Sequence, residues 1–187
     1  MKKLLPVLLM LLVACQSNDK PGKNYNRRDT SVVIRDTVVA APVHATLPPL
    51  AFVKQRVNQI NTSSLPTKHV DFMCDEKTKV TYYYKKNVPV KIAVDYGWVG
   101  DAHAIEEYYF DEGKLIFLYE FIEGGPACEG CIKTNEYRSY IIDDKVFKYL
   151  KNKEEVQCKR CEFGQLSKPY KLLMTSKADE AKKVLCN

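Results

Sequence analysis

Four of the seven cysteines stand in two C-x-x-C pairs, Cys128 with Cys131 and Cys158 with Cys161. Thiols at this spacing suit three kinds of chemistry. In an oxidising compartment they form disulfides, as two sets of thiolates they hold a tetrahedral zinc ion, and at the start of a helix they exchange disulfides with other thiols. The choice among the three depends first on the compartment to which the chain is sent.

The N-terminal fourteen residues indicate that compartment. Lys2 and Lys3 precede an apolar run from Leu4 to Val13. A helix that spans a membrane needs about twenty apolar residues, whereas a positive start followed by a run of about ten is typical of a secretory signal peptide. Residues 1–14 are therefore predicted to be a signal peptide.

The apolar run ends in Leu12-Val13-Ala14-Cys15, which resembles the lipobox of bacterial lipoproteins. The resemblance implies that Cys15 becomes the mature N-terminus and carries acyl chains such as palmitate. More than one chain is needed for stable anchoring, and the partner of this end of the protein is then a membrane. The next residue is Gln16 rather than Asp, which by resemblance to known sorting patterns favours the outer membrane over the inner one.

In an exported chain, the six cysteines after Cys15 favour disulfides. Cys74 and Cys186 are left for a third bridge, which would attach the end of the chain to the region before the strands. The two C-x-x-C pairs are expected to meet if the last hairpin folds back beside its neighbours. Zinc is the less favoured alternative because oxidation competes with metal binding, and redox catalysis is less favoured still because neither pair lies in a βαβ unit. No other cofactor is expected.

Length and composition fit a single domain on a tether. The chain has 187 residues, 45% of them hydrophobic and 28% charged, with a net charge of +6. No basic stripe with interleaved aromatic residues indicates a nucleic-acid partner. Residues 15–49 are polar and interrupted by prolines, which is typical of a flexible linker. We therefore expect a lipidated tether over residues 15–49 and one β-rich domain over residues 50–187.

Periodicity predicts the elements of this domain. Apolar residues at helical spacing predict a helix over about residues 50–61. From residue 78 onward the apolar period becomes two, as in strands with one buried face. Three strand-turn-strand units follow, and Asn, Gly and Asp at their turns favour the left-handed conformations of tight hairpins. These turns are Lys85-Lys86-Asn87, Asp111-Glu112-Gly113 and Asp143-Asp144.

These tyrosine-rich units resemble the strand-turn-strand repeats of many bacterial lipoproteins, over about residues 80–150. The resemblance implies no particular activity. The predicted fold class is α+β and mainly β, an antiparallel meander sheet of about six strands with one helix before it and a short C-terminal helix. That helix covers about residues 177–186, begins at Ser176 as its cap, and is expected to pack on the sheet edge.

Two other groups of residues are candidates for function. Asp101, His103, Glu106 and Glu107 have the composition of a metal site or an acid–base pair, although carboxylates at a strand entrance are commoner. The twelve tyrosines and Trp98 can form a platform for a sugar or peptide, although aromatic residues more often cover the buried face of a sheet. The sequence contains no H-E-x-x-H, G-x-S-x-G or phosphate-binding glycine motif.

Together these features predict a lipid-anchored protein of the bacterial cell envelope that is not an enzyme and that serves as a binding or structural module, with a protein, peptide or glycan as its ligand. One alternative is an inhibitor of an envelope-directed enzyme, similar in build to the small lipoprotein inhibitors of lysozyme. Another alternative is a zinc or thiol redox protein that uses its paired cysteines, Cys128, Cys131, Cys158 and Cys161.

Overall fold

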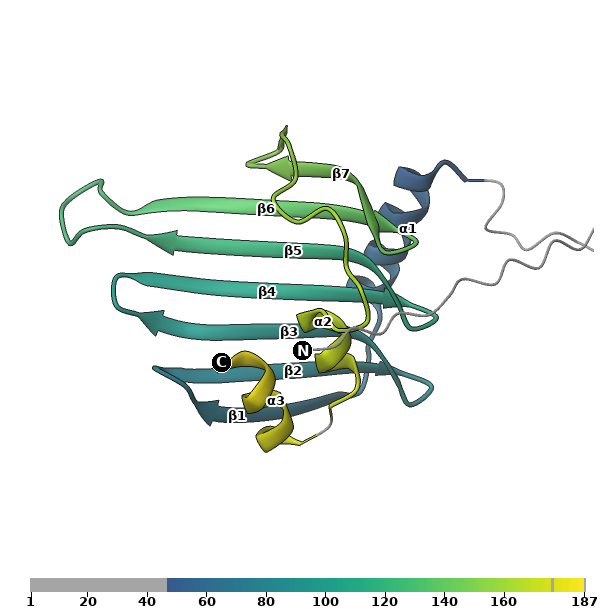
Figure 1. Cartoon of the computed structure of the whole chain (residues 1–187), viewed down its shortest axis with the longest axis horizontal. Helices are drawn as coiled ribbons and strands as arrows, with labels where there is room; N and C mark the ends of the chain where they lie inside the picture. Colours follow the sequence, from purple (N-terminus) through teal and green to yellow (C-terminus); the bar gives the residue numbers. More distant parts are fainter. Residues whose placement is uncertain (1–46, 176, 187) are drawn as a thin grey trace, which may run out of the picture. The chain divides into compact units, whose positions relative to one another are not determined.

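The computed structural model describes residues 47–175 and 177–186. The predicted signal peptide, Cys15 and all but the last three residues of the predicted tether lie outside these ranges. Within them, eight strands form one antiparallel sheet and follow one another in space as in the sequence (Figure 1). The strands are β1 (Thr67–Met73), β2 (Lys77–Lys85), β3 (Val88–Val99), β4 (Ala102–Asp111), β5 (Lys114–Gly124), β6 (Lys133–Ile142), β7 (Lys145–Lys151) and β8 (Glu154–Glu155).

The meander is confirmed, but it has eight strands rather than about six. The two strands that the pattern does not reveal, β1 and β8, lie at the sheet edges. In β1 only Val70 and Phe72 are partly buried, so its apolar alternation is short. β8 has two residues and follows a turn at Asn152 and Lys153, both with positive φ. The Asn-Lys sequence is a weaker turn signal than Asn-Gly.

The predicted hairpin turns are confirmed by their backbone conformation. φ is 62° at Asn87, 78° at Gly113, 46° at Asp143 and 64° at Asp144. Left-handed residues at both central positions give a two-residue turn the twist that antiparallel strands require. Because the turns determine strand register, they also determine which side chains share a face of the sheet.

The sheet is the middle one of three layers (Figure 1). Helix α1 (Pro49–Thr62) packs on one face, and α2 (Lys168–Leu173) and α3 (Ala178–Leu185) pack on the other. Successive strand residues alternate between these faces: Tyr108 belongs to the core beneath α2 and α3, and Tyr109 belongs to the core beneath α1. We call these two surfaces the C-terminal face and the α1 face.

Helix α1 matches the predicted helix over about residues 50–61. Pro49 is tolerated in its first turn, where no helical N–H bond is lost. Val53 and Ile60 are buried against the sheet. The Nε atom of Arg56 lies 2.6 Å from a carboxylate oxygen of Asp111, so an ion pair also joins the helix to the end of β4.

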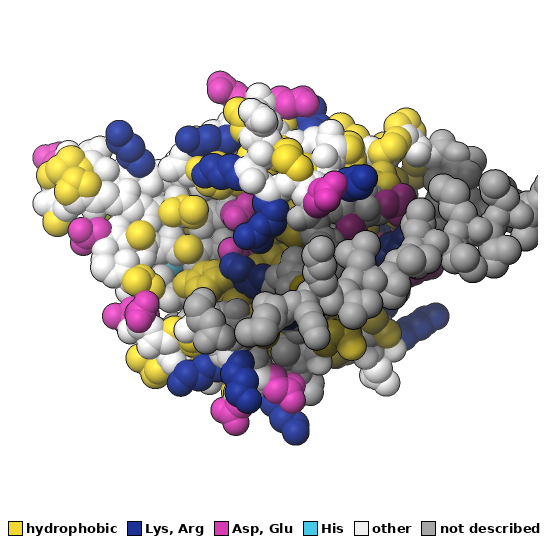
Figure 2. All heavy atoms as spheres, in the orientation of Figure 1, with side chains coloured by type: hydrophobic (Ala, Val, Ile, Leu, Met, Phe, Trp, Pro, Cys, Tyr) yellow, Lys and Arg dark blue, Asp and Glu magenta, His cyan; other side chains and the backbone are white. Residues whose placement is uncertain are grey.

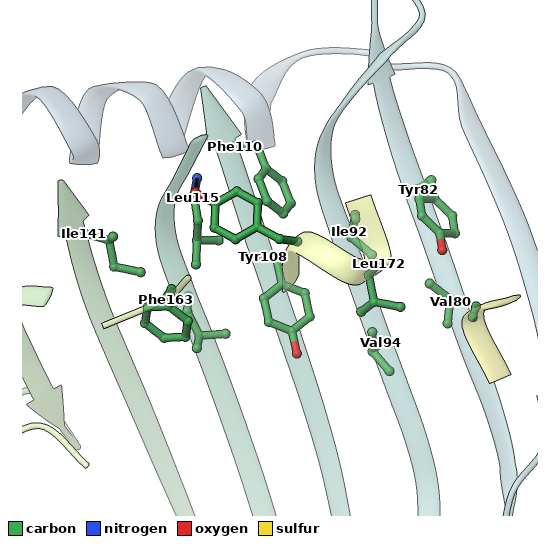
Figure 3. Packing of buried hydrophobic residues seen from close by; sticks show 13 residues of the cluster. Val80, Tyr82, Ile92, Val94, Tyr108, Phe110, Leu115, Ile141, Phe163 and Leu172 are labelled. Carbon is green, nitrogen blue, oxygen red and sulfur yellow. Dashed lines mark hydrogen bonds between the residues drawn. The ribbon is translucent and has the colours of Figure 1, made fainter. Parts of the chain in front are cut away.

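The C-terminal segment contains two helices where one was predicted. Helix α3 corresponds to the predicted helix; it lies along the edge strand β1, and its Ala181 is fully buried in the sheet core. The predicted cap, Ser176, lies outside the described residues. Helix α2 escaped prediction because it is short, yet its Leu172 lies beside Ile92 and Val94 in the core (Figure 3). No helix within the described residues has the length and apolar character needed to cross a membrane.

Candidate functional site

Each C-x-x-C pair closes on itself as a disulfide, Cys128 with Cys131 and Cys158 with Cys161. The first pair lies in the β5–β6 connection, at the end of the sheet away from α1 (Figure 1). The second pair follows β8, and the carbonyl of Cys161 accepts a hydrogen bond from the Val146 N–H at the start of β7. The start of β7 follows the β6–β7 turn, and successive turns of a meander lie at opposite ends of the sheet, so the β5–β6 connection and the β6–β7 turn are at opposite ends. The expectation that the two pairs meet is therefore wrong.

The separation of the pairs bears on the zinc and redox alternatives. Among residues 47–175 and 177–186, no group of three or more His, Cys, Asp or Glu side chains is arranged to hold a metal ion, so the four-thiolate site does not form there. The first helix after Cys161 begins at Lys168. Neither pair therefore occupies the helix N-terminus that lowers the pKa of redox-active thiols.

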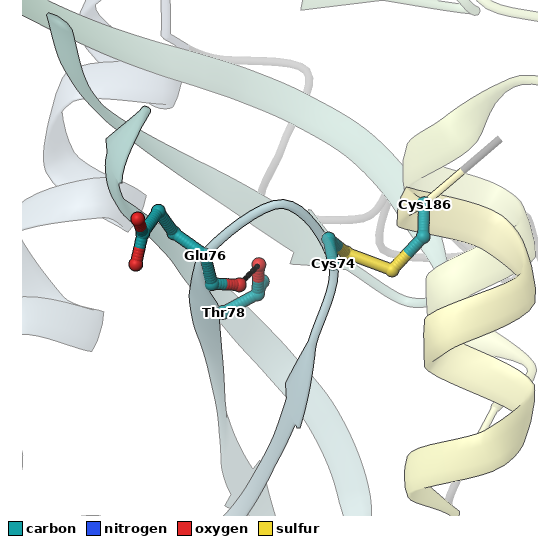
Figure 4. Close-up of a disulfide and its surroundings, with 4 residues drawn as sticks. All are labelled: Cys74, Glu76, Thr78 and Cys186. Atoms are coloured by element: carbon teal, nitrogen blue, oxygen red, sulfur yellow. Dashed lines mark hydrogen bonds between the residues drawn. A yellow bond between two sulfur atoms is a disulfide. The ribbon is translucent and has the colours of Figure 1, made fainter. Parts of the chain in front are cut away.

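The third disulfide joins Cys74 to Cys186, the two residues that the sequence leaves for a third bridge. Cys74 lies in the β1–β2 turn, where its N–H donates to the carbonyl of Glu76 at 3.0 Å, and Cys186 follows the last turn of α3 (Figure 4). The bridge therefore holds α3 against the edge of the sheet. All six cysteines of the described residues are in disulfides.

The predicted acidic and histidine group does not gather at one place. Asp101 lies in the β3–β4 turn, and His103 pairs with Asp95 across that hairpin, with 2.8 Å between Nε2 and Oδ1. Glu106 and Glu107 are neighbours in β4, so they point to opposite faces of the sheet. Only Glu106 lies on the C-terminal face, and there it belongs to a different set of residues.

The tyrosines mainly form the buried faces of the sheet, as the strand propensities favour. Trp98, by contrast, is 48% exposed. It stacks on His103 with 5.5 Å between ring centroids. The tyrosines with buried side chains are Tyr82, Tyr108, Tyr109, Tyr137, Tyr140, Tyr149 and Tyr170.

Glu106 is the centre of a hydrogen-bond network on the C-terminal face. The Nζ atom of Lys168 lies 2.8 Å from each of its carboxylate oxygens. The hydroxyl of Tyr96 donates to Glu106 at 2.6 Å, and that of Tyr108 donates to it as well. Burial, and next the charge of Glu106, raise the pKa of Tyr96 and of Tyr108. Both phenols therefore stay protonated at neutral pH, and Glu106 is a fully partnered carboxylate.

Glu120 lies directly opposite Glu106 on the neighbouring strand β5. Opposite residues of an antiparallel pair have Cβ atoms about 4.5–5.5 Å apart and point to the same face. Unlike Glu106, Glu120 makes no hydrogen bond or ion pair with any described residue. Partial burial, and next the negative charge of Glu106, raise the pKa of Glu120. One face thus carries a satisfied and an unsatisfied carboxylate side by side.

Two cations project over the same site from the loop that the Cys158–Cys161 disulfide closes. The Nζ atom of Lys159 lies 4.7 Å from the centre of the Tyr137 ring, and the guanidinium carbon of Arg160 lies 5.9 Å from the centre of the Phe163 ring. Their positive charges lower the pKa of Glu120, yet neither cation forms an ion pair with a described residue. They are therefore near the carboxylate without neutralising it.

These groups line an open pocket of about 250 Å³ on the C-terminal face. Figure 2 shows basic and acidic side chains around the hollow in the middle of this face. The rings of Tyr137 and Tyr149 stack with 6.1 Å between centroids and form part of the wall. Leu118 and Phe163 supply apolar surface beside them. The pocket therefore combines charges of both signs with an aromatic and aliphatic wall.

The α1 face has a comparable carboxylate, but its partners satisfy it. Lys91 lies 2.8 Å from Glu107, and the hydroxyl of Tyr109 donates to Glu107 at 2.6 Å. Lys91 and Tyr109 also donate to the side-chain oxygen of Asn61 in α1, at 3.1 and 3.0 Å. This network joins the helix to the sheet and leaves little free hydrogen-bonding capacity for a ligand.

Sequence reasoning named Glu106 but missed the residues that surround it. Glu120 interrupts the apolar strand β5, and a charge in the middle of such a strand is the one local signal of the pocket. Lys159 and Arg160 stand between two cysteines, and the recognisable motif of that stretch is the C-x-x-C spacing and not its two basic residues. Lys168 reaches Glu106 from 62 residues away, a distance that no local pattern encodes.

No family model, no curated protein and no solved structure matches this chain.

Proposed function

We propose that the chain is a lipid-anchored protein of the bacterial cell envelope, more specifically of the outer membrane, and that it works as a non-enzymatic binding module. Its ligand site is the pocket lined by Glu106, Glu120, Lys159 and Arg160. The lipobox at Cys15 supports the anchor. Three disulfides among the described cysteines support an oxidising compartment, since cytosolic proteins rarely keep such bonds.

The observation that carries the binding function is the presence of unpaired charges of both signs in one pocket. Glu120, Lys159 and Arg160 line it, and none of them has an ion-pair partner among the described residues. Glu120 is partly buried, and a partly buried charge without an ion-pair partner costs stability, whereas Lys159 and Arg160 are exposed and do not carry that cost. A ligand that supplies the missing partners recovers that cost, which is the usual logic of polar groups in binding sites.

Binding rather than catalysis is favoured by the state of Glu106. Lys168 and two phenols hold its carboxylate, so it is not free to act as a nucleophile or base beside Glu120. A two-carboxylate hydrolase needs both groups available to the substrate. Among the described residues that line the pocket, Glu120 is then the single available carboxylate.

The anchor is tested by mass spectrometry of the N-terminal peptide from the native full chain, with fractionation of outer and inner membranes. We expect the chain to begin at an acylated Cys15 and to sediment with the outer membrane, because several acyl chains hold a protein on a bilayer. C15S should lose the acyl mass and the membrane fraction, whereas the neighbouring S17A should keep both. A native chain that retains residues 1–14, or that begins with an unmodified thiol, would contradict the anchor.

A further inference from the structure

We infer that the pocket binds a small zwitterion, a free α-amino acid or a dipeptide, with its ammonium group on Glu120 and its carboxylate on Lys159 and Arg160. This inference rests on the proposed binding function and names the ligand class of the same pocket. Each charged group of the ligand would meet a group of opposite sign that has no ion-pair partner within residues 47–175 and 177–186.

The ammonium end is assigned to Glu120 by what surrounds that carboxylate. It faces Glu106 across the β4–β5 pair, and two carboxylates on one face attract a cation more strongly than either does alone. Lys168 already occupies Glu106, so the remaining place for a cation is beside Glu120. The raised pKa of Glu120 is consistent with this preference for a cation. A proton and an ammonium group both carry positive charge, and either one offsets the unfavourable negative charge of this carboxylate.

The carboxylate end is assigned to Lys159 and Arg160. They are adjacent in a loop that a disulfide closes, so their backbone is restrained before any ligand arrives. The guanidinium of Arg160 offers a planar fork of N–H donors that matches a carboxylate, and the ammonium of Lys159 adds a second positive charge. Each lies near an aromatic ring, Tyr137 or Phe163, which leaves its hydrogen-bonding capacity free.

The size and walls of the pocket limit the ligand. Pockets for drug-sized ligands measure about 300–1,000 Å³, so a volume of about 250 Å³ suits a smaller molecule. Leu118, Tyr137 and Tyr149 offer apolar and aromatic surface to a side chain. An amino acid or dipeptide with an apolar side chain satisfies the charges and the wall together.

The inference is tested by isothermal titration calorimetry on the full chain in mild detergent. The probes are the free L-amino acids and the alanyl dipeptides, followed by the N-acetyl and amide forms of the strongest binder. We expect the zwitterion to bind and both capped forms to bind at least about tenfold more weakly, since each loses one charge-assisted contact. Glucuronate, an anion without an ammonium group, is titrated in parallel.

Variants locate the site. E120Q removes the contact with the ammonium group and should weaken binding of the zwitterion at least about tenfold. R160Q removes a contact with the carboxylate and should weaken binding of the zwitterion to a similar extent. E154Q changes an exposed residue and should leave the affinity unchanged. A cooperative unfolding transition for each variant shows that it is folded. Equal binding of the zwitterion and its capped forms, or no binding by any probe of the panel, would overturn the zwitterion assignment. If glucuronate alone binds and R160Q abolishes that binding, the zwitterion assignment is overturned but the pocket remains the ligand site. If the zwitterion binds and neither E120Q nor R160Q weakens it, both the zwitterion assignment and the pocket as its site are overturned.

Discussion

At the scale of single residues, Glu106 and Glu120 show how environment separates two identical side chains. They face each other across one strand pair. Glu106 receives the ammonium of Lys168 and two phenol hydroxyls, whereas Glu120 receives no such partner from the part of the chain that the structure describes. Glu106 therefore contributes to the stability of the fold, whereas Glu120 is available to form an ion pair with a ligand.

The raised pKa of Glu120 implies that the folding stability depends on pH. A carboxyl whose pKa is higher in the folded than in the unfolded state binds its proton more tightly when folded. Stability therefore falls as the pH rises from the unfolded-state pKa through the folded-state pKa, and the loss persists at neutral pH. The charged and titratable groups that line the pocket with Glu120 are Glu106, Lys159, Arg160, Lys168, Tyr137 and Tyr149.

E120Q removes this loss, so we expect it to raise the free energy of unfolding at neutral pH and to flatten the pH dependence in the acid range. Urea unfolding of the full chain at several pH values measures both effects. E154Q, which changes an exposed strand residue, should leave the profile as in the wild type. A lower stability of E120Q at neutral pH would mean that the carboxylate has a stabilising partner in the folded state.

At the scale of elements, the two C-x-x-C loops have the same spacing and different surroundings. The Cys128–Cys131 loop lies at the far end of the β5–β6 hairpin, while the Cys158–Cys161 loop carries Lys159 and Arg160 over the pocket. The chemistry of the thiols does not distinguish them. They differ in position, because the chain crosses the C-terminal face of the sheet after β8 and so places the second loop beside the pocket.

These two loops provide a matched pair of variants. We expect C158S/C161S to weaken zwitterion binding at least about tenfold, because an open loop must be ordered when the ligand binds. C128S/C131S should bind as the wild type does. Both disulfides have a sequence separation of three residues, so their effects on the unfolded chain are alike. Calorimetry measures the affinities, and equal effects of the two double variants would refute a special role for the second loop.

The elements themselves were predictable where their signals are local. The hairpins around Asn87, Gly113 and Asp143-Asp144 depend on turn residues and on alternation within a few positions, and they were predicted. The edge strands β1 and β8 and the short helix α2 were not. Their residues have weak patterns of their own and take their conformation from the sheet on which they pack.

At the scale of the whole molecule, the Cys74–Cys186 bridge joins two points of the chain that are 112 residues apart. It connects the first turn of the sheet to the last helix. The α3 helix is short, and apart from Ala181 its side chains are partly or fully exposed, so packing alone holds it weakly. The bridge therefore keeps the C-terminal layer on the sheet.

We expect C74S/C186S to lower the free energy of unfolding by about 5 kcal/mol, because in the chain-entropy model a cross-link over a loop of this length restricts the unfolded chain by that amount. Urea unfolding measures the change. C128S/C131S, whose loop is short, serves as the reference and should lose much less. A loss below about 1 kcal/mol for C74S/C186S would show that α3 is held mainly by its packing.

The sequence by itself determined the mainly β class, the antiparallel meander, the hairpin turns and the helix before the sheet. These features depend on apolar period and turn chemistry, which act between residues close in the chain. Only the tertiary structure decided that Glu120 faces Glu106, that Lys168 neutralises only one of them, and that the two C-x-x-C pairs stay apart. Strand register and the path of the chain across the sheet bring distant residues together, and no local pattern contains that information.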